Sequence, residues 1–251
     1  MKYKLSELPG KVLTKLTSLQ LIDRRYQFAI GERLHLTRFL PHYRVDCVFD
    51  IGANEGQYAR MLRRHTGYRG LIISFEPNPA TAAIARNYAR RDGNWIVEEI
   101  AVSRADGEQT FNVMAASQFS SLSKLRANDA DVEQFLESGR VTKSFSVRTE
   151  TLTTAYERLV AAHGFKRPFL KMDTQGYDVE IVRHAGPAIR YFVGLQSEMA
   201  FKKVYESSVD WREAIALYES LGFELSAIVA NNGGQFPALV ESDCIMNRRE
   251  V

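Results

Sequence analysis

The stretch from Val48 to Tyr58, VFDIGANEGQY, carries the clearest structural signal in the chain. A short apolar run ends in an acid, a turn with two glycines four residues apart follows, and a one-sided helix begins near Gln57. Glycines in such a turn let the backbone pass close to a ligand and leave the amides of the helix N-terminus accessible. We therefore expect a strand, loop and helix of an open parallel sheet, whose ligand crevice lies at the strand ends.

Short apolar runs alternate with helix-period segments from residue 45 onward, the pattern of a parallel sheet with crossover helices. The expected fold class is α/β. We expect seven strands, over residues 45–50, 71–75, 95–103, 168–172, 192–197, 223–229 and 244–247. The sequence predicts helices after residue 57, from Pro79 with Asn78 as N-cap, and around residues 152–159 and 211–218. Residues 106–148 break the alternation and predict an insertion over the sheet edge, with one strand-like segment, QTFNVM.

Length and composition restrict the class of protein. The 251 residues fit a basic helical extension over residues 1–44 and one α/β domain over residues 45–251. Apolar residues make up 45% and charged residues 25%, which excludes a collagen-like or disordered chain. Polar residues interrupt the longest uncharged run, and the N-terminus lacks the apolar core of a signal peptide. A cytoplasmic protein without a membrane span is therefore expected.

The N-terminal extension is strongly basic, with nine Lys and Arg residues against three acids within residues 1–45. Its apolar stripe, Val12, Leu16 and Leu19, would allow peripheral docking on an anionic inner membrane or on a polyanionic partner. The alternative is a solvated helix packed on its own domain. No nucleic-acid partner is expected, and the oligomeric state stays open.

The glycine loop, GANEG, differs from the dinucleotide-binding pattern G-x-G-x-x-G. The carboxylates of Asp50 and Glu55 beside this turn would repel a phosphate and suit a ligand with a positive charge or an amino group. A purely structural glycine turn is the alternative. The loop thus disfavours a nicotinamide-dependent dehydrogenase.

A second acid, Glu76 in IISFEPN, ends the next expected strand 26 residues after Asp50, which suits one β-α-β unit. An acid at this place accepts hydrogen bonds from ribose hydroxyls. Together, the two motifs predict a nucleoside ligand with a positive group and no phosphate, a description that S-adenosylmethionine meets.

A third acid, Asp173 in LKMDTQGY, ends the strand that should neighbour the first one. Residues just past this strand would face the reactive end of the ligand, so Asp173 would orient a methyl acceptor. The alternative makes Asp173 the N-cap of a helix that begins near Tyr177.

The motifs stand in one order along the chain: FDIGANEGQYA, SFEPNP, EIAVSRADGEQTFNV, SSL, LKMDTQGYDVEIV and LQSEM. In this order and spacing, over residues 46–247, the chain resembles the FkbM-type family of S-adenosylmethionine-dependent methyltransferases. The resemblance implies a class I methyltransferase fold: a Rossmann-like, seven-stranded and mostly parallel sheet with one antiparallel edge strand and helices on both faces. It also implies O-methylation, usually of a sugar hydroxyl or a secondary metabolite, as in polysaccharide biosynthesis.

The resemblance also assigns site residues. Those expected to bind S-adenosylmethionine are Gly52, Asn54, Gly56 and Tyr58 at the methionine part, with Asp50 before them, Glu76 and Pro77 at the ribose, Ala101 and Val102 at the adenine, and Ser121 in the nearby SSL loop. Two positions depart from the family pattern. Gln175 stands where an acid is common, which leaves the charge near the acceptor open, and Thr153 replaces a frequent Asp, which should affect only helix capping.

Methyl transfer is an in-line displacement at carbon, so the protein mainly aligns the acceptor oxygen and helps to remove its proton. The candidate general bases are Asp173 first and Glu198 second. Glu198 has the alternative role of an acid at a helix start. No metal is expected, because no group of Cys, His and Asp residues has ligand spacing.

Two other functions stay open. The same fold would methylate an amine or a carboxylate of a small metabolite, because a fold does not fix the acceptor. Alternatively, the chain would bind S-adenosylmethionine without turnover and act as a scaffold subunit at the inner membrane through its basic N-terminal helix.

Overall fold

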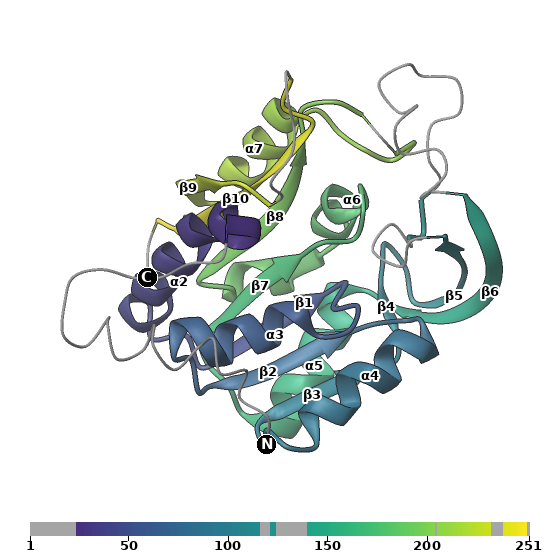
Figure 1. The fold of residues 1–251 in the computed structure, drawn as a ribbon, viewed down its shortest axis with the longest axis horizontal. Coiled ribbons are helices and arrows are strands. Elements are labelled where there is room, and N and C mark those ends of the chain that lie inside the picture. Colours follow the sequence, from purple (N-terminus) through teal and green to yellow (C-terminus); the bar gives the residue numbers. More distant parts are fainter. Residues whose placement is uncertain (1–23, 116–120, 124–139, 204, 232–237, 250–251) are drawn as a thin grey trace.

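A seven-stranded sheet forms the centre of the computed structural model, which describes residues 24–115, 121–123, 140–203, 205–231 and 238–249 (Figure 1). The strands follow the order β3-β2-β1-β7-β8-β10-β9. Their bounds are Cys47–Ile51 (β1), Leu71–Phe75 (β2), Trp95–Glu98 (β3), Pro168–Met172 (β7), Gly194–Ala200 (β8), Phe223–Val229 (β9) and Glu241–Arg248 (β10). Strands β3, β2, β1, β7 and β8 run parallel, whereas β10 runs antiparallel to both β8 and β9.

The expected α/β fold with a seven-stranded, mostly parallel sheet and an antiparallel edge is confirmed. The reversed strand, β10, lies between β8 and the outermost strand, β9. Strands β2, β7 and β9 have the predicted bounds. Every residue of β1 and β7 is buried, as expected for central parallel strands that are covered by helices on both faces.

The prediction of one strand over residues 95–103 is wrong. The segment divides into β3 in the central sheet and β4 (Ala101–Val102) in a second sheet of order β4-β6-β5. Strand β5 (Gly107–Met114) contains the predicted QTFNVM segment, but the sequence pattern does not predict β6 (Val141–Glu150), which is mostly exposed. These strands depend on pairing between distant parts of the chain, which no local pattern contains. The insertion thus builds a small sheet beside the first one (Figure 1).

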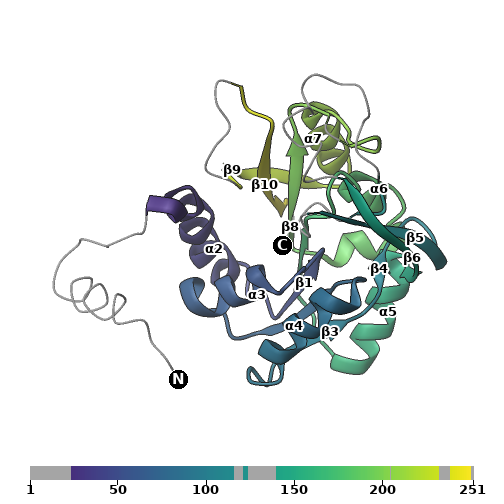
Figure 2. The same ribbon diagram turned by 45° about the vertical axis from the view of Figure 1, so that its right-hand side comes forward.

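Helices cover both faces of the central sheet (Figure 2). One buried cluster includes α2 (Ile30–His42), α3 (Gln57–Met61) and α4 (Pro79–Ala89), and the other includes α5 (Leu152–His163), α6 (Asp178–Arg183) and α7 (Trp211–Ser220). A π-helical turn, Leu62–Thr66, continues α3, and short 3-10 helices span Arg24–Ala29 and Gly186–Tyr191. Asn78 caps α4 by accepting a hydrogen bond from the amide of Ala80, as predicted.

The expected capping effect at Thr153 is wrong. Thr151 caps α5, because its hydroxyl accepts a hydrogen bond from the amide of Thr154. The hydroxyl of Thr153 instead donates to the carbonyl oxygen of Ala185 and thereby ties α5 to the segment after α6.

The described part of the N-terminal extension packs onto the sheet. Leu36, Phe39 and Leu40 of α2 are buried, and the ring of Phe39 meets that of Phe169 edge-on, with 5.3 Å between centroids. The apolar stripe expected at Val12, Leu16 and Leu19 lies outside the described residues. Within the described part of the chain, no helix is long and apolar enough to cross a membrane.

Candidate active site

A cleft of about 400 Å³ opens where β1, β2 and β7 end. It brings together several expected cofactor-binding residues and one candidate base: Gly52, Glu76, Pro77, Ala101, Val102, Ser121 and Asp173. Ala101 and Val102 belong to β4, so the second sheet forms a wall of the cleft. Leu122 of the expected SSL loop also lines it. Sequence reasoning does not identify two further lining residues, Phe111 and Tyr177, because aromatic residues in such patterns are typical of a core.

Glu76 follows β2 and fixes the glycine loop. Its Oε2 accepts a hydrogen bond from the amide of Asn54 (2.8 Å), and its Oε1 accepts one from the amide of Asn78 (2.8 Å). Burial raises the pKa of Glu76, and the two amides partly oppose this shift. The carboxyl group is therefore held in one orientation, with lone pairs left on both oxygens.

The two glycines of the loop have different roles. Gly52 has φ +76°, and a Cβ there would lie 1.9 Å from the carbonyl oxygen of Asp173, so only glycine lets the ends of β1 and β7 meet. Gly56 has φ +79°, and a Cβ there would lie 2.5 Å from the ring of Trp95. Gly56 does not line the cleft. Its lack of a side chain instead lets the start of α3 pack closely against Trp95.

Asp50 and Tyr58 lie inside the sheet and do not line the cleft. Asp50 Oδ1 is 3.2 Å from Nζ of Lys171, and Asp50 Oδ2 accepts a hydrogen bond from Ser74 Oγ (3.0 Å). The same Nζ lies 5.2 Å from the centroid of the Tyr58 ring, and the Tyr58 hydroxyl donates to Oε1 of Gln196 (2.9 Å). The charge of Asp50, expected to act on the ligand, is thus balanced by a buried lysine.

Lys171 is a residue that sequence reasoning misses. Burial lowers its pKa, but the carboxylates of Asp50 and Asp173 outweigh burial, and the net shift of the Lys171 pKa is upward. The side chain therefore stays charged. Its sequence signal is a lysine within the buried strand PFLKM, where an unpaired charge would be strongly unfavourable.

Asp173 follows β7, lines the cleft and has a side chain that is 47% exposed. Its Oδ2 lies 3.7 Å from Nζ of Lys171, and its Oδ1 accepts a hydrogen bond from Nε2 of Gln175 (2.8 Å). The N-cap alternative is wrong, because α6 begins at Asp178, whose carboxylate accepts from the amide of Thr174. Asp173 is thus available to a ligand.

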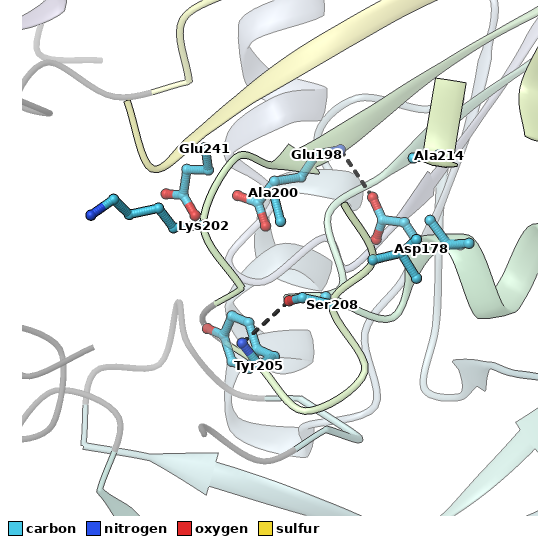
Figure 3. A pocket seen from close by; sticks show the side chains of 11 residues that line it. Asp178, Glu198, Ala200, Lys202, Tyr205, Ser208, Ala214 and Glu241 are labelled. Carbon is cyan, nitrogen blue, oxygen red and sulfur yellow. Dashed lines mark hydrogen bonds between the residues drawn. The ribbon is translucent and has the colours of Figure 1, made fainter. Parts of the chain in front are cut away.

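A second cavity of about 400 Å³ adjoins the loop that follows β7 (Figure 3). Its lining includes Asp178, Glu198, Lys202, Tyr205, Ser208 and Glu241. Glu198 lies within β8, so the helix-start alternative is wrong. Burial and the neighbouring carboxyl group of Glu241 raise the pKa of Glu198 well above its usual value, and Asn231 Nδ2 donates to Glu198 Oε1 (3.1 Å). Glu198 therefore takes up a proton more readily than an exposed glutamate, and its protonated form can donate a hydrogen bond.

The cleft suits an adenosine with a positively charged sulfonium. Glu76 offers acceptor oxygens. The expected binding residue Asn54 is not among the residues that line the cleft, but its amide binds Glu76 and its buried Oδ1 has no hydrogen-bond partner among the described residues. The described lining contains two carboxyl groups and no Lys, Arg or His side chain, which favours a cation over a phosphate. Across the described ranges, no group of three or more His, Cys, Asp or Glu residues could hold a metal ion.

Several known proteins are similar to this chain. The family model "Methyltransferase FkbM domain" matches residues 50–225. A search of curated proteins finds no match. Among solved structures, Aeropyrum pernix fibrillarin with bound S-adenosyl-L-methionine is 14% identical, with a TM-score of 0.48 over 89% of this chain and 76% of that one. The O-methyltransferase from Bacillus cereus in complex with SAH is 10% identical, with a TM-score of 0.47 over 97% of this chain and 89% of that one.

These two structures are too distant to inform on function. The family model, in contrast, covers more than half of the chain, including the glycine loop, Glu76, Asp173 and Glu198. The chain therefore belongs to the FkbM methyltransferase family, whose methyl donor is S-adenosylmethionine.

Proposed function

We propose that this protein transfers a methyl group from S-adenosylmethionine to a hydroxyl group of a sugar, a glycan or a secondary metabolite. The observation that carries the proposal is the place of Asp173. This residue lines the cleft that suits the donor, and the loop that it begins also lines the adjoining cavity. A carboxylate at this junction would reach an acceptor hydroxyl next to the methyl group.

In the donor cleft, we assign Glu76 to the ribose hydroxyls. Its carboxyl group is held by two backbone amides, so it would bind these hydroxyls without losing further freedom. Ala101 and Val102 would contact the adenine, and Asn54 Oδ1 would accept a hydrogen bond from the amino group of the methionine part. Bound there, S-adenosylmethionine supplies an electrophilic methyl group on sulfur.

In the adjoining cavity, we assign two different tasks to the two acids. Asp173 would take the proton of the acceptor hydroxyl while the acceptor oxygen bonds to the methyl carbon, whose bond to sulfur breaks. Glu198, whose pKa is raised by burial and by Glu241, would donate a hydrogen bond that orients the acceptor. Alignment of the reacting atoms would supply much of the rate acceleration.

The cavity also bears on the class of acceptor. Its described lining has carboxyl groups from Asp178, Glu198 and Glu241 and one lysine, Lys202. Even with Glu198 protonated, the carboxyl groups of Asp178 and Glu241 outnumber the one lysine, which disfavours a carboxylate or phosphate at the reacting position because like charges repel in a partly buried site. A neutral hydroxyl group fits better, and an amine remains the second candidate.

Calorimetric titration with S-adenosylmethionine and with S-adenosylhomocysteine tests the donor assignment. Replacing Glu76 with Ala should weaken binding roughly tenfold to one-hundredfold, since hydrogen bonds to a charged group contribute about 1.5–3 kcal/mol. Glu157→Ala, at an exposed position of α5, is the matched control. Equal binding by both variants would remove Glu76 from the ribose site.

A screen with methyl-labelled donor then tests the reaction. Neutral sugars, glycans, nucleotide sugars, amines and carboxylates are offered as separate acceptor classes. We expect label only in hydroxyl acceptors, and we expect Asp173→Asn to lose transfer while it keeps donor binding. Donor binding by the wild-type protein without transfer to any class would favour the silent scaffold.

A further inference from the structure

Gln175 connects the exposed acid of the donor cleft to the wall of the adjoining cavity. We propose that Gln175 is a positioning residue, which holds the carboxylate of Asp173 in a fixed orientation and is itself oriented by the hydroxyl of Tyr205. The inference rests on the proposed function, in which Asp173 accepts the proton of the acceptor.

Two hydrogen bonds form this chain of contacts. Gln175 Nε2 donates to Asp173 Oδ1 (2.8 Å), and the Tyr205 hydroxyl donates to Gln175 Oε1 (2.5 Å). The other carboxylate oxygen of Asp173 lies 3.7 Å from Nζ of Lys171. Both oxygens of Asp173 thus face a partner, although the side chain is nearly half exposed.

The backbone around Gln175 is held from two sides. Gln175 and Gly176 both have positive φ, at +56° and +83°. Ser121 Oγ donates to the carbonyl oxygen of Thr174 (2.9 Å), and Ser207 Oγ donates to that of Gly176 (2.8 Å). An unusual backbone conformation persists only where the surroundings fix it, as these contacts do.

The direction of the hydrogen bonds follows from Tyr205. Burial raises the pKa of Tyr205, so its hydroxyl keeps the proton and acts as a donor. The carbonyl oxygen of the Gln175 side chain must then face Tyr205, and its NH2 group must face Asp173. An amide fixed in this way presents only donors to Asp173, whose remaining lone pairs are left to take up a proton.

The position of Tyr205 gives this contact a functional consequence. Tyr205 is buried and lines the adjoining cavity, whereas Asp173 lines the donor cleft. Glutamine is well suited to join them, since its amide offers an acceptor to the phenol and a donor to the carboxylate. An acid at position 175 would instead place a second carboxylate next to Asp173.

Nuclear magnetic resonance on the full 15N-labelled chain tests the geometry without donor or acceptor. The side-chain NH2 signal of Gln175, identified by its absence in Gln175→Met, should exchange with solvent at least tenfold more slowly than that of the exposed Gln57. Asp173→Ala and Tyr205→Phe should each bring the rate close to that of Gln57. Tyr191→Phe, which removes an exposed hydroxyl elsewhere, should leave it unchanged. Unprotected exchange in the wild-type protein, or protection that survives both variants, would overturn the proposal.

Transfer kinetics with the acceptor found in the screen test the role in catalysis. Gln175→Met should lower kcat at least tenfold while the Kd for S-adenosylmethionine changes less than twofold. The double variant Gln175→Met with Tyr205→Phe should be no slower than Gln175→Met, because both act through one contact. Gln175→Glu should move the low-pH limb of the kcat profile to higher pH, because two adjacent carboxyl groups share a proton. If the two losses of kcat are additive and the pH profile does not shift, Gln175 does not position Asp173. This conclusion would hold even if the NH2 group of Gln175 is protected from exchange and the protein transfers methyl groups as proposed.

Discussion

The buried pair of Lys171 and Asp50 links the stability of the sheet to the site. Their side chains are 6% and 0% exposed, and Lys171 also contacts Asp173. We expect Lys171→Met to lower the free energy of unfolding by about 3–5 kcal/mol, because Asp50 becomes a buried charge without a counter-charge. Urea denaturation measures this loss, with Lys166→Met at an exposed position as control. Adding Asp50→Asn to Lys171→Met should regain most of it; a further loss would contradict this explanation.

Gln196 of β8 supports two acids at once. Its Nε2 donates to Glu32 Oε1 (2.8 Å) and to Asp243 Oδ2 (2.7 Å). Burial raises the pKa of both acids, and the charge of Glu32 raises that of Asp243 further. A group with a higher pKa in the folded state binds more protons there, so it stabilises the fold at low pH. This contribution is lost as the pH rises through the folded-state pKa.

The pH dependence of stability should therefore change in Asp243→Asn. Asparagine keeps an acceptor oxygen for Gln196 and removes one of the two interacting charges. We expect the fall in the free energy of unfolding between about pH 5 and about pH 8 to become shallower than in the wild-type protein. Urea denaturation at both pH values measures it, with Glu157→Gln as a control at an exposed position. An unchanged slope would show that Asp243 does not titrate in this range.

The local sequence pattern is sufficient to predict those secondary-structure elements that are determined by contacts between neighbouring residues. The Asn78 cap and the bounds of β2 and β7 follow from a few adjacent residues. Topology then brings Glu76 and Asp173, each just past a strand, to one edge of the sheet. Local pattern fails for β6 and for the break between β3 and β4, because these depend on pairing between distant segments.

The same limit applies to side chains of the site. Phe111 of β5 reaches the cleft because the second sheet forms, and no local signal separates it from core residues. The contacts of Gln175 with Asp173 and Tyr205 depend on the orientation of each side chain in a folded loop. A motif identifies which residue types are present, whereas their pairing is a property of the assembled structure.

The loop after β1 gives a prediction about close approach of the backbone. In Gly52→Ala, the new Cβ would lie 1.9 Å from the carbonyl oxygen of Asp173, so the ends of β1 and β7 must separate. We expect binding of S-adenosylmethionine to become undetectable by calorimetry. Gly93 also has positive φ (+79°) but nothing within 4 Å of an added Cβ, so Gly93→Ala isolates the backbone effect of about 1–2 kcal/mol. Equal behaviour of the two variants would rule out the steric explanation.

Across the whole molecule, the described part of the N-terminal extension shares a core with the α/β domain. Phe39 of α2 packs against Phe169, and Glu32 of α2 accepts a hydrogen bond from the buried Gln196 of β8. His35 Nε2 lies 2.9 Å from Ser226 Oγ of β9. Removal of residues 1–44 would therefore expose the part of the sheet that α2 covers. A loss of membrane binding in such a variant could then result from unfolding as well as from the loss of a docking segment.

The membrane hypothesis needs a deletion that spares α2. Deleting residues 1–23 removes four lysines and the apolar stripe but none of the contacts described for α2. We expect this variant to lose sedimentation with anionic vesicles and to keep the Tm and the donor affinity of the full chain. Deleting residues 1–44 should lower the Tm sharply, because each buried side chain such as Leu36 or Leu40 contributes about 1.5–3 kcal/mol. If the full chain and the shorter deletion bind vesicles equally well, any membrane contact lies outside residues 1–23. If both bind vesicles only weakly, the membrane hypothesis is wrong and the role of α2 in the enzyme is structural.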